Sequence, residues 1–307
     1  MSFQTPPPPT SIFEVSFPSP GVLLATINRE KRMNSVPIQG HHEGTALWNW
    51  MDNEPSMRVG IITGKGSKAF CAGADLLEQR DISRGDETRP NKVAEGGFAG
   101  LSQRRGKKPV IAAVNGLALG GGFEICLNWC VLAALESGRE EGEEERGKIT
   151  NSYTPPRDLF SDLIVASPQA YFGLPEVLRG LYAGAGGLSR IVRDCGMRIG
   201  TELALTGRRV PAQEALSLRL INRIAQSHES VLDEALEMAK EIANKSPDAI
   251  IVSRSGLRES WETASTIEAD KITAEKYGRG LLASENLRIG LEAFAAKKQP
   301  QWVASKL

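Results

Sequence analysis

Two glycine-rich stretches have residue types and spacing that suit the stabilisation of negative charge. They are residues 69–76, AFCAGADL, and residues 112–124, AAVNGLALGGGFE. Each ends an apolar, strand-like run with small residues and then begins a helix-like run, which leaves backbone N–H groups free and lets a ligand approach the main chain. Such groups can hold a developing negative charge. A purely structural tight turn is the alternative, and the spacing matches neither GxGxxG nor GxxxxGK[ST], which disfavours a dinucleotide or phosphate loop.

Two further segments follow downstream, YFGLPE at 171–176 and GAGG at 184–187. In this order the four segments resemble the crotonase (enoyl-CoA hydratase/isomerase) superfamily, and more narrowly the fungal-type peroxisomal enoyl-CoA hydratases. The resemblance extends over about residues 22–302, with one interruption. It implies an α/β fold, built as a spiral of repeated β-β-α units with a C-terminal helical trimerisation region. It also implies that coenzyme A enters as the substrate thioester, so that no separate cofactor is needed.

The family's two oxyanion-hole amides fall on Ala74 and Gly121 of this sequence. By this resemblance they would polarise the thioester carbonyl and stabilise the enolate that forms when a proton leaves or joins the α-carbon. The physical requirement agrees, because an enolate needs preorganised donors where charge develops, and losing one donor costs about 3 kcal/mol.

The family's two catalytic carboxylates fall on Glu124 and Glu176. In hydratases of this kind the first positions and activates the water that adds to the β-carbon, and the second exchanges the α-proton. Two carboxylates on one water suit a general acid/base pair, since burial can separate their pKa values. The alternative for either glutamate alone is a solvated helix residue.

Contacts with coenzyme A are also implied by the resemblance. A basic residue near a chain end is otherwise usually only solvated. The residues expected to contact coenzyme A are Arg32, Met33, Ala72, Asp75, Leu76, Phe294 and Lys297.

We therefore expect an acyl-CoA hydro-lyase that hydrates a 2-enoyl-CoA or dehydrates a 3-hydroxyacyl-CoA. A Δ3-Δ2 enoyl-CoA isomerase, which can work with a single carboxylate, is one alternative, and Glu124 argues against it. A catalytically inactive acyl-CoA-binding or scaffolding relative is another, although all four catalytic positions are kept. The substrate is left open between a fatty acyl-CoA, a branched 3-hydroxyacyl-CoA such as mevalonyl-CoA, and an acyl intermediate of secondary metabolism.

Composition excludes several other classes. Lys plus Arg and Asp plus Glu are balanced at 37 each, so that no overall field favours nucleic acid. The 4 cysteines and 3 histidines form no CxxC pair or cluster, which argues against a bound metal and for reduced thiols. No apolar stretch approaches the roughly 20 residues of a membrane-spanning helix.

Alternation of strand-like and helix-like runs predicts the architecture. Residues 21–28, 58–63, 110–114 and 162–166 are expected strands, and 41–51 has the apolar spacing of a helix. The runs at 212–220, 230–244, 247–263 and 265–282 are charged and helix-periodic. We expect a disordered, proline-rich lead-in at 1–10, a catalytic core at 11–210 and a helical region at 211–307.

The last three residues, Ser305, Lys306 and Leu307, match a peroxisomal import signal. We therefore expect a peroxisomal location and an import receptor as a partner. The family resemblance adds the expectation of a homotrimer or hexamer.

Residues 129–161 interrupt the family pattern with a charge run followed by turn formers. A genuine surface insertion is one interpretation, and a retained intron is the other. Trp129, Cys130 and Val131 require the donor-like bases GTGYGT, and Phe160-Ser161 can encode an acceptor-like YAG. Excision between these points keeps the reading frame and leaves one cysteine codon between Asn128 and Asp162. Sequencing the mature transcript distinguishes the two interpretations.

Overall fold

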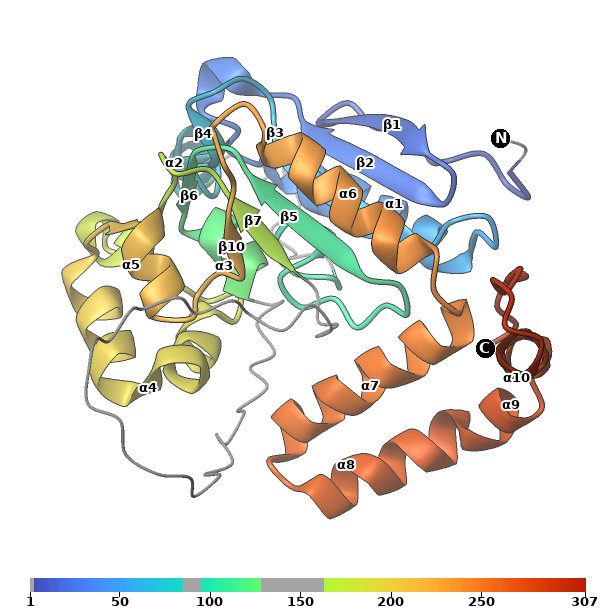
Figure 1. Ribbon diagram of the computed structural model, residues 1–307. Coiled ribbons are helices and arrows are strands. Elements are labelled where there is room, and N and C mark those ends of the chain that lie inside the picture. Colours follow the sequence, from blue (N-terminus) through green and yellow to red (C-terminus); the bar gives the residue numbers. More distant parts are fainter. Residues whose placement is uncertain (1–2, 85–94, 128–162) are drawn as a thin grey trace, which may run out of the picture.

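The computed structural model describes residues 3–84, 95–127 and 163–307. Within these residues the largest sheet has six strands in the order β1-β2-β3-β5-β7-β10 (Figure 1). Its neighbours run parallel except for the antiparallel pair β1-β2. The strands are β1 (Phe13–Ser19), β2 (Val22–Ile27), β3 (Val59–Gly64), β5 (Val110–Val114), β7 (Ile164–Ala166) and β10 (Arg223–Ile224).

A second sheet of shorter strands lies beside the first. It contains β4 (Ala69–Cys71), β6 (Leu117–Leu119), β8 (Tyr171–Gly173) and β9 (Val210–Pro211). The chain repeatedly passes from the large sheet to the small sheet and then into a helix, as in β3-β4-α2, β5-β6-α3 and β7-β8-α4. These helices are α2 (Leu76–Ser83), α3 (Gly121–Leu127) and α4 (Gly187–Thr206). The predicted spiral of β-β-α units is therefore confirmed.

The central strands β3, β5 and β7 of the large sheet are buried on both faces, and alternate side chains reach opposite layers. Val59 and Ile61 of β3 pack in the cluster that includes α6 (Val231–Ala243), whereas Ile62 packs in the cluster that includes α1 (Ile38–Asn53). The four strands predicted from apolar runs correspond to β2, β3, β5 and β7. Residue 162, where the last of them was expected to begin, lies outside the described residues.

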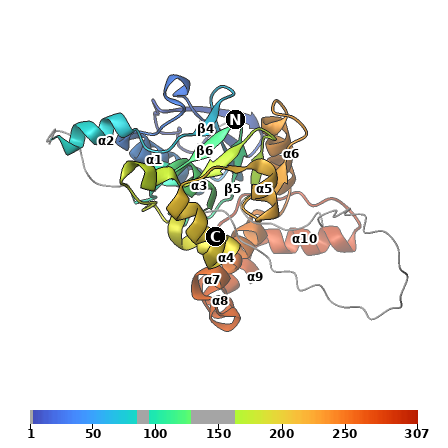
Figure 2. The same ribbon diagram turned by 90° about the vertical axis from the view of Figure 1, so that its left-hand side faces the viewer.

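The C-terminal part is less uniform than expected. Helix α5 (Ala212–Ser217), strand β10 and helix α6 still pack on the two sheets, although a helical region was expected from residue 211. Figures 1 and 2 show that the following helices extend away from the core. They are α7 (Pro247–Thr263), α8 (Thr266–Thr273), α9 (Arg279–Leu282) and α10 (Glu285–Ala295). No helix in the described ranges is both long and apolar enough to cross a membrane.

Contacts near the end of the chain hold it against α7 and against the segment before β5. The Ser305 hydroxyl is hydrogen-bonded to the Asp248 carboxylate, and Lys107 Nζ donates to the backbone oxygen of Leu307 over 2.9 Å. Residues 129–161, for which an insertion or a retained intron was expected, lie outside the described residues.

Candidate active site

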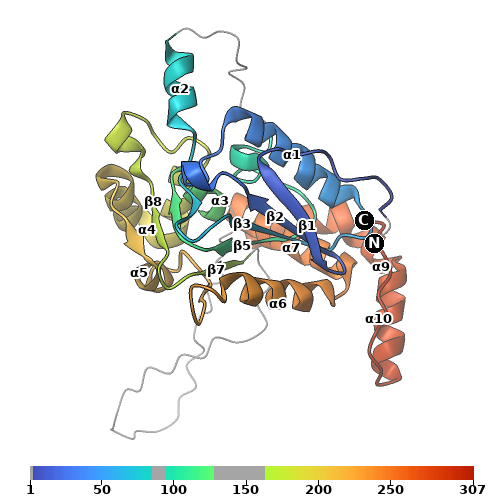
Figure 3. The same ribbon diagram turned by 90° about the horizontal axis from the view of Figure 1, so that it is seen from above.

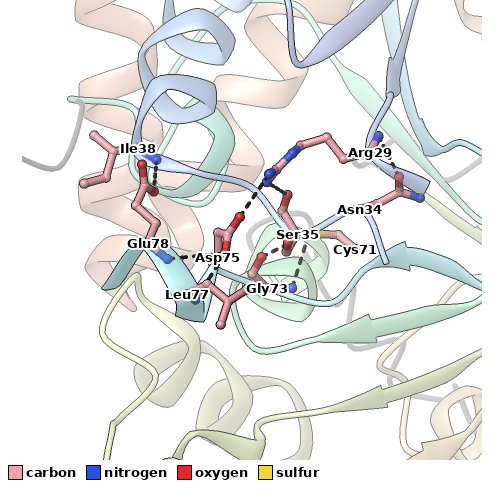
Figure 4. A network of polar contacts seen from close by, with 9 residues as sticks. All are labelled: Arg29, Asn34, Ser35, Ile38, Cys71, Gly73, Asp75, Leu77 and Glu78. Carbon is pink, nitrogen blue, oxygen red and sulfur yellow. Dashed lines mark hydrogen bonds and ion pairs between the residues drawn. The ribbon is translucent and has the colours of Figure 1, made fainter. Parts of the chain in front are cut away.

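The loop between β4 and α2 is held by a polar network, shown in Figure 4. The Asp75 carboxylate accepts hydrogen bonds from the backbone N–H groups of Leu77 and Glu78 and so caps α2. It also forms an ion pair with Arg29, with 2.9 Å between Nη2 and Oδ2. These partners use the carboxylate for the structure of the loop, whereas the sequence had suggested that Asp75 contacts coenzyme A.

Backbone hydrogen bonds fix the same loop from its other side. Ala72 N–H donates to the Met33 carbonyl over 3.0 Å, and Val36 N–H donates to the Gly73 carbonyl over 2.9 Å. Between these fixed points, the Ala74 N–H donates to no acceptor within the described residues. The loop therefore offers this amide as a free, preorganised donor.

The second glycine-rich turn lies against the first. Gly73 has a φ of +95°, and a Cβ added to it would lie 3.4 Å from the backbone nitrogen of Gly121. Helix α3 begins at Gly121, and the Gly120 carbonyl accepts from the N–H groups of Phe123 and Glu124. The Gly121 N–H has no acceptor in the described part of the chain. Two unpaired amide donors, on Ala74 and Gly121, are thus brought to neighbouring turns.

Glu124 lies on α3 and is 3% exposed. Its Oε1 accepts a hydrogen bond of 2.9 Å from the Gly187 N–H at the start of α4, and the Ala185 backbone also donates to it. Burial raises the pKa of Glu124, while these two donors and the nearby Arg190 act in the opposite direction. The GAGG segment therefore supplies the backbone donors that hold this carboxylate.

Glu176 lies in a short 3-10 helix, Pro175–Arg179, after β8. Its Oε2 is buried and has no hydrogen-bond partner among the described residues. Burial raises the pKa of Glu176 to about 7, and the charge of Glu124 acts in the same direction. A Cβ at Gly120 would lie 3.1 Å from Glu176 Oε1, so this carboxyl lies directly against the turn that begins α3.

A cavity of about 290 Å³ brings these groups together. All four predicted catalytic residues, Ala74, Gly121, Glu124 and Glu176, line it, although the sequence places them in three separate segments. Polar and aromatic residues that the sequence analysis had not singled out also line it. They are His41, Gln79, Phe98, Arg179 and Tyr182.

The residues predicted to contact coenzyme A fall into two groups. Ala72 and Leu76 line the cavity, whereas Arg32, Met33 and Asp75 do not. Phe294 lies on α10, 86% exposed, and Lys297 follows the same helix. Figure 3 shows α10 at the side of the molecule away from α2 and α3, so the chain does not bring these two residues to the cavity.

Metal ligation has no structural support in residues 3–84, 95–127 and 163–307. No group of three or more histidine, cysteine, aspartate or glutamate side chains there is placed to hold an ion.

Comparison with known sequences assigns the family. The sequence model of the Enoyl-CoA hydratase/isomerase family matches residues 18–135 and 158–305. The chain belongs to this family. The two matched ranges contain all four residues of the predicted catalytic set, and residues 136–157 between them are not matched.

Several named relatives of this enoyl-CoA hydratase/isomerase family member are similar over most of their length. The mevalonyl-coenzyme A hydratase SIDH of Beauveria bassiana is 41% identical over 313 residues, covering 100% of both chains. The Aspergillus fumigatus protein of the same name is 40% identical, with 95% of each chain covered. The carnitinyl-CoA dehydratase of Proteus mirabilis is 33% identical, covering 92% of this chain and 95% of that protein.

A solved structure supports the same assignment. The enoyl-CoA hydratase of Mycobacterium tuberculosis H37Rv superposes with a TM-score of 0.76 at 32% identity, covering 95% of this chain and 98% of that one. Family and fold together support hydro-lyase chemistry on coenzyme A thioesters.

Proposed function

We propose that this protein reversibly dehydrates a 3-hydroxyacyl-CoA to a 2-enoyl-CoA, and that its substrate is mevalonyl-CoA. The observation that carries the chemistry is the shared cavity, in which two backbone amides without an acceptor among the described residues lie with the buried Glu124 and the partly buried Glu176. Acceptance of an α-proton, stabilisation of an enolate and protonation of a leaving hydroxyl each have a group in this cavity.

In the dehydration direction, the Glu176 carboxylate removes the α-proton. The electron pair moves into the thioester carbonyl, whose oxygen accepts hydrogen bonds from the N–H groups of Ala74 and Gly121. The bond between C3 and its hydroxyl then breaks, and Glu124 donates a proton to that hydroxyl, which leaves as water. Hydration reverses each step: Glu124 takes a proton from water, and Glu176 delivers one to the α-carbon.

The two environments support this division of roles. Glu124 is held by two backbone donors, which favour its charged form and suit a base that orients water. Glu176 has an unpaired oxygen and a pKa raised to about 7, which suits a group that both gives and takes a proton near neutral pH.

The relatives named as mevalonyl-coenzyme A hydratases support the choice of substrate. Mevalonyl-CoA carries a methyl and a hydroxyl group on C3 and a second hydroxyl on C5. A cavity that served only alkyl chains would have no use for polar wall residues, and this one has His41, Gln79 and Arg179.

Purified full-length protein tests the proposal with a panel of thioesters. We expect dehydration of mevalonyl-CoA and hydration of its 2-enoyl product, followed by liquid chromatography and mass spectrometry. Crotonyl-CoA serves as the unbranched comparison, and a 3-enoyl-CoA tests the isomerase alternative. Faster turnover of crotonyl-CoA would exclude mevalonyl-CoA as the preferred substrate. Conversion of the 3-enoyl compound alone would exclude hydro-lyase function.

Peroxisomal location and trimer or hexamer formation are further proposals. A fluorescent fusion at the N-terminus should reach peroxisomes, and deletion of Ser305, Lys306 and Leu307 should leave it in the cytosol. Import that survives the deletion would show that the tripeptide is not the address. Analytical ultracentrifugation of the purified protein measures the oligomeric state directly.

A further inference from the structure

The side chain of His41 forms part of the cavity wall, and its two ring nitrogens have different environments. His41 lies on α1, lines the cavity, and accepts a hydrogen bond at Nδ1 from the Ala99 backbone N–H over 3.1 Å. An imidazole nitrogen that accepts from an amide carries no proton, so the neutral ring must carry its proton on Nε2. Burial lowers the pKa of His41 to about 4, with His42 acting in the same direction, so the ring is neutral at physiological pH.

The segment that orients this ring is itself rigidly held. Ala99 lies in the 3-10 turn Phe98–Gly100, and its carbonyl accepts a hydrogen bond of 3.1 Å from Trp48 Nε1. Gly44 of α1 lies so close that an added Cβ would be 2.2 Å from the same carbonyl oxygen. With the Ala99 N–H aimed at Nδ1, the orientation of the imidazole ring is set by packed backbone.

The ring is also close to the reacting centre. The His41 and Phe98 rings pack with centroids 4.7 Å apart. Phe98 in turn lies against Gly121, since a Cβ added to Gly121 would be 2.4 Å from the Phe98 ring. One aromatic ring therefore separates His41 from the amide expected to hold the thioester oxygen, and no described residue accepts a hydrogen bond from the Nε2–H of His41.

We infer that the His41 Nε2–H donates a hydrogen bond to a hydroxyl oxygen on the acyl chain beyond C3, and that it selects hydroxylated over plain alkyl substrates. The inference rests on the proposed function and names the residue that would recognise the substrate class. His41 is partly buried and lines the cavity, so an acyl chain that covers the Nε2–H without offering an acceptor leaves this donor unpaired. An unpaired donor costs about 1–3 kcal/mol, so a chain that lacks the hydroxyl would bind less well.

Discrimination of this kind is effective because it rests on a polar group that the wrong substrate cannot satisfy. An alkyl-specific pocket gains only through packing, and an added hydroxyl group changes such binding little. The C5 hydroxyl of mevalonyl-CoA is the oxygen that the histidine would bind.

Two substitutions separate donation by Nε2 from the support that Nδ1 gives to Ala99. His41→Asn keeps an acceptor near the position of Nδ1 and removes the Nε2 donor. His41→Gln places an amide donor near the position of Nε2 and removes the acceptor. His42→Asn, at the exposed neighbouring position, is the matched control.

Each variant is assayed with mevalonyl-CoA and with the analogue that lacks the C5 hydroxyl, and the ratio of the two kcat/KM values is compared. We expect the wild-type ratio to favour mevalonyl-CoA by about 5–150-fold, which is the energy of one unpaired donor converted to a ratio of kcat/KM values. His41→Asn should bring the ratio close to one with little change for the analogue, whereas His41→Gln should retain part of the preference and His42→Asn all of it.

Three outcomes would overturn the inference. If His41→Asn leaves both kcat/KM values unchanged, Nε2 does not bind the hydroxyl. If it lowers both values by the same factor, His41 only supports the cavity wall. Thermal melting of each variant identifies a loss that comes from unfolding, and the ratio is taken only from folded protein. If the wild type dehydrates neither compound, the proposed function fails together with this inference. If it dehydrates both, and the ratio of the two kcat/KM values is the same in the His41 variants, only this inference fails.

Discussion

Glu124 and Glu176 line the same cavity, but their carboxyl groups have different hydrogen-bond partners. Glu124, where α3 meets the start of α4, has backbone N–H groups directed at its carboxylate. Glu176, at the corner between β8 and α4, is packed against Gly120 and has a buried oxygen with no donor. Burial raises the pKa of both carboxyls. At Glu124 two backbone donors and Arg190 oppose this rise, whereas at Glu176 one backbone donor opposes it and the charge of Glu124 adds to it.

This difference shows how one fold can give two carboxylates separate tasks. Several donors stabilise the charged form of Glu124, while burial that is opposed by a single backbone donor keeps a proton on Glu176 near neutral pH. A pair that shares one proton can then both remove and deliver protons in a single turnover.

Removal of either carboxylate should have the largest effect. Glu124→Gln and Glu176→Gln should each lower kcat/KM for hydration by about 10²–10⁴-fold, because each removes a positioned acid or base. Glu237→Gln, an exposed change on α6, is the matched control. Full hydratase activity in Glu124→Gln would rule out the two-carboxylate mechanism.

Exchange of the substrate's α-proton with deuterium from D₂O distinguishes the roles of the two carboxyl groups in the same two variants. We expect exchange to continue in Glu124→Gln, because Glu176 still reaches the α-carbon, and to stop in Glu176→Gln. The reverse pattern, detected by mass spectrometry of the thioester, would mean that the two roles are exchanged.

A steric change can disturb one environment alone. A Cβ at Gly187 would lie 2.8 Å from Glu124 Cγ, so Gly187→Ala should displace that carboxylate and lower kcat by about 10²-fold. Gly256→Ala on α7 is the matched control, because its nearest contacts would be at 3.7 Å. Equal activity of the two variants in a steady-state hydration assay would show that the position of Glu124 tolerates movement.

The pH dependence of kcat/KM follows from the shared proton. Addition of water to the double bond neither releases nor consumes a proton. Hydration and dehydration therefore both need Glu124 and Glu176 to carry one proton between them, and kcat/KM must have the same pH dependence in the two directions. As pH rises through about 7, the pair loses its last proton, and kcat/KM should fall by about tenfold per further pH unit. A flat profile from pH 6 to 9 in both directions would contradict the raised pKa of Glu176.

The smallest effect should be on stability. The pKa of Glu176 is higher in the folded protein, about 7 against 4.5, so the folded state binds its proton more tightly. Its contribution to stability is therefore complete below pH 4.5 and is lost as pH rises through 7. Glu176→Gln avoids this loss, and its melting temperature relative to the wild type should increase by on the order of 2 °C between pH 5 and pH 8. No change in that difference, by scanning fluorimetry, would mean that the carboxyl is well solvated.

Local sequence motifs, and the family resemblance that they carry, were sufficient to predict the fold and to name four residues that line one cavity. Strands β2, β3, β5 and β7 are runs of apolar residues because both faces of their sheet are buried, and burial on both faces leaves a continuous signal. The four catalytic positions lie in short motifs whose glycines and strand-to-helix turns are readable one segment at a time. The short strands β9 and β10 carried too few residues for such a signal.

Only the tertiary structure decided what surrounds those positions. The donors to Glu124 come from the Ala185 and Gly187 backbone, 63 residues away in the latter case, and a backbone N–H has no signature in the side-chain sequence. In the sequence, His41 cannot be distinguished from any other polar residue of an amphipathic helix. The packing of α1 against the turn Phe98–Gly100 gives it a hydrogen bond from Ala99 and a place in the cavity wall. The structure also gives Asp75 the role of capping α2 and leaves Phe294 exposed on α10, and the contacts with coenzyme A predicted for these two residues stay predictions. Residue types and local spacing determined which groups could react, and long-range packing determined their partners, their pKa values and the walls around them.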